Sequence, residues 1–147
     1  MCENMEMKWT ASSLIPKDKH DKSTISELMR ISEEEVIPIL PQILDWIADM
    51  NWPIATDMIK VLIRFPNSLV NPIKQALAPK SEDVMLKYWI IKELLPQLTY
   101  EAQYALWVDF VRISENPTEV ERTEGVDVVA YDFNKRFCIN NGLGLEL

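Results

Sequence analysis

A short charged segment near the start of the chain holds the residue types that metal and acid–base sites use. Lys17, Asp18, Lys19 and Asp21 surround His20, the one histidine among 147 residues. A metal centre is disfavoured here, because two lysines oppose a cation and consecutive side chains cannot all face one point. A lone histidine without a positioned nucleophile also lacks the geometry of general acid–base catalysis. We expect a solvated loop with neither metal nor cofactor.

A second group of reactive types consists of carboxylates and one lysine. Asp45 and Asp49 are four residues apart, so their side chains would share one face of a helix. With Lys87 they define an alternative hypothesis, an enzyme of unknown class that uses a carboxylate and lysine pocket. A solvated face or helix caps explain both aspartates more simply, since both lie off the apolar stripe. The chain lacks a glycine-rich phosphate loop and the Gly-x-Ser-x-Gly and His-Glu-x-x-His motifs, which favours a non-enzymatic protein.

The tryptophans form a third group. Four of them fall within or at the ends of predicted helices: Trp46, Trp52, Trp89 and Trp107. Core packing is the ordinary role of such residues, because an indole removes a large area from water. Trp46 lies off the apolar stripe of its helix, and it could border a groove with Asp49 and Asn51.

Composition limits the class of protein that could carry these groups. A chain of 147 residues with 48% apolar content has the size of one domain and can form a core without disulfides. The formal net charge of −8 repels nucleic-acid backbones and anionic membrane surfaces. We therefore expect no nucleic-acid and no membrane partner, and a DNA-binding helical-repeat protein is the weakest hypothesis.

Cysteine use and the apolar segments point to one compartment. Cys2 and Cys138 lie far apart and suggest free thiols. The acidic residues 1–6 do not resemble a secretion signal, and the apolar stretch 36–48 is broken by prolines and too short to span a bilayer. The sequence predicts a cytoplasmic protein.

Charge is unevenly distributed along the chain. Residues 8–22 carry a net charge of +2, whereas residues 115–132 carry −5. A solvated face is the ordinary explanation of such an acidic run. The alternative is a surface on which a basic protein partner docks.

Start and stop signals predict about seven helical segments. We expect them near residues 24–32, 38–50, 52–65, 67–78, 84–95, 100–114 and 118–137, with Gly125 weakening the last. Thr24 with Glu27 and Thr118 with Glu121 show the capping-box pattern, in which side chain and backbone groups bond reciprocally. Single N-caps are expected at Asn51, at Ser81 or Asp83, and at Thr99.

The third and fifth segments resemble each other at a shift of 32 residues, from Ile54 to Leu86. The shift superimposes two sets of apolar positions: Ile54, Met58, Ile59, Leu62 and Ile63 on Leu86, Ile90, Ile91, Leu94 and Leu95. This indicates two similar helical hairpins stacked in sequence, each burying a face on its neighbour. An ordinary helix bundle is the alternative, because all core helices share a period of 3.6 residues.

Four motifs carry a resemblance to a known family. They are Leu14-Ile15-Pro16-Lys17-Asp18-Lys19-His20-Asp21, Pro41-x-x-Leu44-Asp45-Trp46-Ile47-x-Asp49-Met50-Asn51-Trp52-Pro53-Ile54-Ala55, Lys87-Tyr88-Trp89-Ile90-Ile91 and Arg112-Ile113-x-x-Asn116-Pro117-Thr118-x-x-Glu121. Over residues 14–130 the chain resembles a bacterial family of small proteins of unknown function. The resemblance implies an all-helical, HEAT-like, right-handed array and no established activity or cofactor.

We therefore expect an all-α fold, a short right-handed α-α superhelix of about three stacked helical hairpins plus a C-terminal helix. Residues 1–147 would form one helical-repeat domain, with an N-terminal arm over 1–22 and a C-terminal tail over 138–147.

The expected function is a protein–protein interaction module. Its candidate surface gathers polar and aromatic positions of the motifs: Lys17, Asp18, Lys19, Asp45, Trp46, Asp49, Asn51, Trp52, Lys87, Tyr88 and Trp89. Structural roles at helix ends are an equal alternative for Asp49, Asn51 and Lys87. A specific version is an immunity or inhibitor protein that neutralises a basic partner by electrostatic attraction.

Overall fold

The computed structural model describes residues 11–143, and every regular element within them is a helix. The elements in chain order are η1 Ala11–Leu14, α2 Ile25–Leu28, α3 Glu33–Val36, η2 Ile37–Ile39, α4 Leu40–Leu44, η3 Asp45–Ile47, α5 Ala55–Leu62, α6 Val70–Leu77, α7 Val84–Trp89, η4 Ile90–Leu94, η5 Leu95–Gln97, α8 Tyr100–Ala105, α9 Trp107–Glu115, α10 Glu119–Thr123 and α11 Val126–Asn140. Most η elements are short 3-10 helices, but η4 is a π-helix. The all-α prediction is confirmed, and within the described range no helix is long and apolar enough to cross a membrane.

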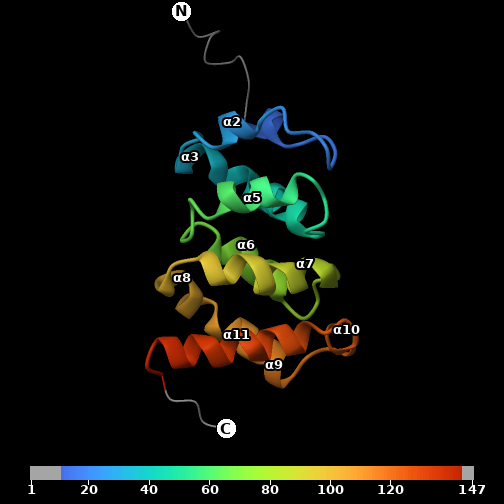
Figure 1. Ribbon diagram of the computed structural model, residues 1–147, viewed down its shortest axis with the longest axis vertical. Helices are drawn as coiled ribbons and strands as arrows, with labels where there is room; N and C mark the ends of the chain where they lie inside the picture. Colours follow the sequence, from blue (N-terminus) through green and yellow to red (C-terminus); the bar gives the residue numbers. More distant parts are fainter. Residues whose placement is uncertain (1–10, 144–147) are drawn as a thin grey trace, which may run out of the picture.

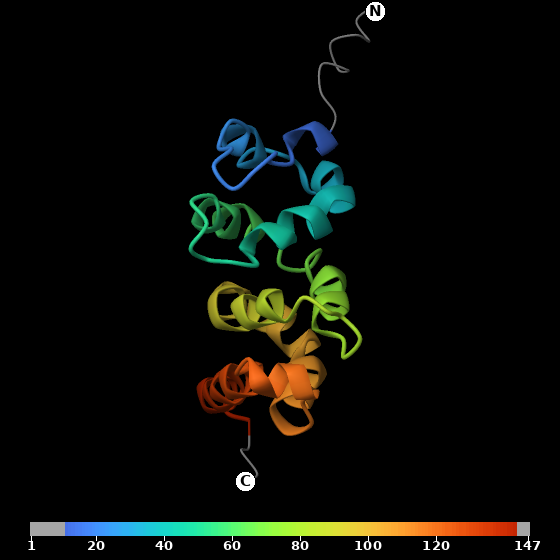
Figure 2. The same ribbon diagram turned by 90° about the vertical axis from the view of Figure 1, so that its right-hand side faces the viewer.

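The helices follow one another in layers along the long axis of the molecule (Figure 1). Seen from the side, α2, α5, α7 and α11 succeed one another along one flank, and α4, α6 and α9 along the other (Figure 2). Contacts join the two flanks, since α4 packs on α5, α6 on α7, and α9 on α11. Successive layers are joined by contacts of α4 with α6, of α6 with α9, and of α7 with α11.

One continuous core runs through these layers. The positions that the 32-residue shift superimposes are buried in both α5 and the α7–η4–η5 segment, except Ile63, which is half-buried. Cys138 also lies in the core, where burial raises the pKa of its thiol. Cys2 lies outside the described residues.

Three of the predicted helix starts are confirmed by side-chain hydrogen bonds. Thr118 and Glu121 form the complete capping box at α10. Asp83 accepts a hydrogen bond from the Leu86 N–H at α7, and Thr99 accepts one from the Ala102 N–H at α8. Each signal lies within three residues of its partner, which is why the sequence showed it.

Two other predicted caps are wrong. The Thr24 hydroxyl donates to the Leu14 carbonyl at 2.6 Å, and its side chain does not cap α2. Asn51 lies outside α5, where its N–H donates to the Asp49 carboxylate at 2.9 Å. The Leu14 carbonyl binds the hydroxyl of Thr24, whereas α5 begins at Ala55, with Ile54 and not Asn51 at its N-cap position.

The second predicted helical segment, 38–50, is preceded by a capping box that lies outside its predicted boundaries. The Ser32 hydroxyl accepts from the Glu35 N–H, and the Glu35 carboxylate accepts from the Ser32 N–H. Helix therefore begins at Glu33, ahead of the predicted start near residue 38. Pro38 and Pro41 lie in its first turns as expected, but their missing N–H groups divide it into α3, η2, α4 and η3.

The later segments are also less regular than predicted. Residue 106 separates α8 from α9, and Gly125 separates α10 from α11 with a left-handed φ of +79°. The expected tail over 138–147 begins as helix, since α11 extends to Asn140. Of the expected arm over 1–22, the described part includes η1, whose Leu14 is buried.

Gly125 allows a direct test of this backbone break. Nothing lies within 4 Å of a Cβ added at Gly125, so only the left-handed conformation would oppose a side chain. We expect Gly125→Ala to lower the free energy of unfolding by about 1–2 kcal/mol. Gly125→Asn should lose less, because asparagine tolerates this region. Urea denaturation measures both changes, and an alanine variant as stable as the wild type would contradict the prediction.

Candidate functional site

Lys87 differs from every other residue of the predicted surface, because it lies inside the protein. Its side chain is 1% exposed. The ammonium group donates to the Glu121 carboxylate at 2.6 Å and to the Ala78 carbonyl at 2.9 Å. Thus a residue expected to meet a partner binds other parts of its own chain.

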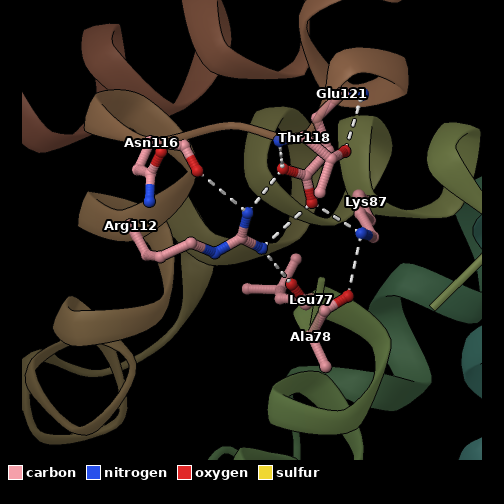
Figure 3. A network of polar contacts seen from close by, with 7 residues as sticks. All are labelled: Leu77, Ala78, Lys87, Arg112, Asn116, Thr118 and Glu121. Carbon is pink, nitrogen blue, oxygen red and sulfur yellow. Dashed lines mark hydrogen bonds and ion pairs between the residues drawn. The ribbon is translucent and has the colours of Figure 1, made fainter. Parts of the chain in front are cut away.

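Glu121 is the centre of a buried polar network (Figure 3). Its carboxylate, also 1% exposed, accepts from both terminal nitrogens of Arg112, at 2.6 and 3.0 Å. The Thr118 N–H donates to it at 2.8 Å, as the capping box requires. One carboxylate therefore receives hydrogen bonds from α7, from α9 and from the start of its own helix.

The C-terminal end of α6 completes the network. Arg112 donates to the Leu77 carbonyl at 2.8 Å, while Lys87 binds the neighbouring Ala78 carbonyl. The last carbonyls of a helix lack intrahelical partners and carry partial negative charge. They therefore help balance the second cation, which the single carboxylate of Glu121 leaves uncompensated.

Ionisation of Glu121 follows from these contacts. Burial alone would raise the pKa of Glu121, but hydrogen bonds from Arg112, Lys87 and the Thr118 N–H lower it to about 2.

A hollow of about 220 Å³ borders Lys87, Thr118 and Glu121. The ion pair of Lys87 and Glu121 joins α7 to α10.

The predicted charged segment near His20 is an exposed loop. Asp21 holds it together by accepting from the Ser23 hydroxyl at 2.6 Å and from the Lys17 N–H at 2.8 Å. The hydrogen bond from the Ser23 hydroxyl, followed by those from backbone N–H groups, lowers the pKa of Asp21 to about 2. Asp18 accepts from the His20 N–H. Nowhere in 11–143 do three or more His, Cys, Asp or Glu side chains form a group that could hold a metal ion.

Asp45, Asp49 and Lys87 are not joined by any hydrogen bond or ion pair within the described range. Asp45 lines a hollow of about 230 Å³ that also includes Asp83, and partial burial followed by the charge of Asp83 raises the pKa of Asp45. Asp49 closes a turn by binding the Asn51 N–H. The three groups postulated for an enzymatic pocket thus have separate environments.

The predicted aromatic residues form two half-buried pairs. Trp46 and Trp52 meet edge to face with ring centroids 5.6 Å apart, and Tyr88 and Trp89 do so at 5.0 Å. Trp46 and Tyr88 pack against the core. Neither pair is exposed enough to be a prominent surface, and their role in partner binding stays a prediction.

Most exposed apolar side chains lie in the last layers of the molecule, at residues that the predicted surface does not include. Seven have exposed fractions of 41% to 77%: Tyr100, Tyr104, Val108, Val120, Val128, Tyr131 and Ile139. On α9 and α11, Val108 and Val128 lie opposite the buried Phe110 and Phe133 by helical spacing. The side chains of Trp107 and Asn134, bonded at 2.7 Å, hold the two helices together. We call Tyr104, Val108, Val128 and Tyr131 the end surface.

Exposed carboxylates occur in the same part of the chain as the end surface. Glu115, Glu119, Glu124 and Asp132 are exposed in the acidic run, against the one exposed guanidinium of Arg122. Glu121 belongs to the same run but is buried and paired. The structure therefore separates the acidic run into surface charge and one internal ion.

The sequence did contain a signal for the end surface. Tyr104 and Val108 are four residues apart and lie outside the buried stripe.

Comparison with protein families gives one finding. The model of a family described as Domain of unknown function (DUF5071) matches residues 14–133. The matched range includes all three charged members of the buried network and all four residues of the end surface. A search among curated proteins finds no match to the chain.

Removing Lys87 should destabilise the protein severely. Lys87→Met leaves a buried carboxylate with one cation fewer, and we expect a loss of about 3–5 kcal/mol in the free energy of unfolding. Lys74→Met is the matched control, because Lys74 pairs with Asp109 at 2.7 Å at the surface. That pair should contribute less than about 1 kcal/mol. Equal losses in urea denaturation of the two variants would contradict the buried role.

The network also predicts how stability depends on pH. The pKa of Glu121 falls from an ordinary 4.5 to about 2 on folding, so its ionised form stabilises the fold above pH 4.5. That contribution, about 3 kcal/mol, disappears as the pH drops towards 2. Glu121→Gln should therefore show a smaller loss of stability than wild type across this window. The exposed Glu119→Gln variant serves as control, and identical pH profiles for all three proteins would overturn the prediction.

Proposed function

The chain belongs to the DUF5071 family of unknown function, and on that premise we propose that it is a non-enzymatic module that binds a basic protein. The observation that carries the proposal is the end surface, a set of exposed apolar side chains on α8, α9 and α11, with exposed carboxylates nearby in the sequence that make no ion pair within residues 11–143. Exposed apolar patches rimmed by polar groups are typical of interaction sites on soluble proteins. Tyrosine is also enriched among the residues that dominate binding energies.

Charge decides which partner this surface fits. Within residues 115–132 four exposed carboxylates stand against one exposed arginine, and the whole chain carries −8. A partner with lysine or arginine around an apolar centre would be attracted before contact and oriented on encounter. A second copy of this chain would bring like charges together, which disfavours self-association through the same face.

The more detailed expectations belong to this proposal. They are a HEAT-like, right-handed stacking of the layers, a bacterial cytoplasmic setting, and a role as an immunity or inhibitor protein. The layered packing and the net negative charge support them. In this version the end surface would cover a basic toxin or enzyme and block its action.

The test compares four forms of the whole chain as bait in an extract of the source organism. They are the wild type, Val108→Ser/Val128→Ser, Glu119→Lys/Glu124→Lys, and the control Met29→Ser/Ile37→Ser, which changes one exposed apolar residue at the C-terminal cap of α2 and one in η2. We expect wild type and control to retain the same basic protein and to lose it as salt rises. Both end-surface variants should bind it at least about tenfold more weakly, a loss of about 1.4 kcal/mol.

Two outcomes would overturn the proposal. One is a retained protein that all four forms bind equally, which would place the contact elsewhere. The other is an acidic partner, or sedimentation showing a wild-type dimer that the end-surface substitutions dissociate.

A further inference from the structure

A third hollow, of about 420 Å³, lies where η4, η5, α8 and α11 meet. Its volume falls within the range of small-molecule sites. Lys92 and Arg136 line it, and none of the lining residues among 11–143 is a carboxylate. In a chain with 23 acidic residues and a net charge of −8, such a lining differs from the charge of the molecule as a whole.

The backbone next to this hollow departs from regular helix. Pro96 has no N–H, and ahead of it the helix widens into the π-helical segment η4, which carries Lys92. Side chains bind carbonyl groups there: Gln97 donates to the Glu93 carbonyl at 2.9 Å, and Gln103 to the Leu95 carbonyl at 2.7 Å. Segments of π-helix are rare and are frequent at functional sites.

Among the described residues, neither Lys92 nor Arg136 has a polar partner within the protein. Within residues 11–143, Lys92 and Arg136 make no ion pair and no side-chain hydrogen bond, and both are exposed. The planar guanidinium of arginine suits two-point binding of a carboxylate or phosphate, and lysine adds a point charge. The two groups therefore fit the anionic end of a ligand.

The remaining walls indicate an organic ligand. Pro96, Phe133 and Phe137 form the apolar part of the lining, the two phenylalanines through the small part of each residue, 5% and 3%, that stays exposed. Gln103 uses its amide nitrogen on the Leu95 carbonyl, and Asn141 uses its own on the Phe137 carbonyl at 2.8 Å. Their amide oxygens remain as acceptors for hydroxyl or N–H groups. Both amides are already oriented by these bonds, so little ordering is needed when a ligand binds.

We propose that this hollow binds a small organic anion, with its carboxylate or phosphate between Lys92 and Arg136 and its apolar part against Phe133 and Phe137. The site is separate from the end surface, so it would be a second activity of the protein. It does not depend on the proposed binding of a basic protein.

Calorimetric titration of the whole chain at low salt tests the proposal with four probes: phenyl phosphate, benzoate, inorganic phosphate and neutral benzyl alcohol. We expect saturable binding of phenyl phosphate or benzoate with a Kd below about 1 mM, and none of benzyl alcohol. The stronger of the two anions identifies the preferred head group. Trp107, whose ring lies 5.8 Å from that of Phe137, provides a fluorescence signal of the same event.

Lys92→Gln/Arg136→Gln should weaken binding at least about tenfold. Lys135→Gln is the matched control, because it removes an exposed cation of α11 that does not line the hollow. No saturable binding of any anion up to about 10 mM would overturn the proposal. Equal weakening by Lys135→Gln would do so as well, since it would reveal unspecific attraction. Inorganic phosphate binding as tightly as phenyl phosphate would overturn the assignment of an organic ligand.

Discussion

The C-terminal half of the protein depends on one buried carboxylate that two cations share. Glu121 and Lys87 are each 1% exposed, and their separation from water is favourable only when every polar group keeps a partner. Arg112 and the last carbonyls of α6 supply the remaining partners. Removing any member leaves an unpaired group in a region of low dielectric constant. The ends of α6, α7, α9 and α10 are therefore held in one mutual arrangement.

Apolar packing by itself would not select that arrangement. The layers are joined through a continuous core of leucine, isoleucine and phenylalanine, and such contacts have little directional preference. Hydrogen bonds between charged groups do have a preferred direction, because a carboxylate accepts the two hydrogen bonds of a guanidinium in one plane. By holding α10 against α7 and α9, the network also sets where α11 begins. The positions of the end surface and of the cation-lined hollow follow from it.

Comparison of particular residues shows where sequence reasoning succeeded and failed. The Thr118–Glu121 box was predictable because both partners lie within one helical turn. The capping box of Ser32 and Glu35 has the same local spacing, but it was missed because Pro38 and Pro41 placed the predicted helix start near residue 38. Thr24 failed because its hydroxyl finds the Leu14 carbonyl ten residues away. Lys87 was assigned to the surface although it lies four residues before Ile91 and seven before Leu94, on the apolar stripe of its helix. That position was a sign of burial.

The sequence by itself determined a helical protein, its breaks at proline, a weak point at Gly125, and an acidic region near its C-terminal end. These properties depend on backbone preferences and on signals that act across three or four residues. Only the tertiary structure decided which charges remain on the surface. Glu121 reaches Lys87 across 34 residues of sequence, and Arg112 reaches Leu77 across 35. Partners so far apart are selected by the packing of whole helices, and no local pattern records that choice.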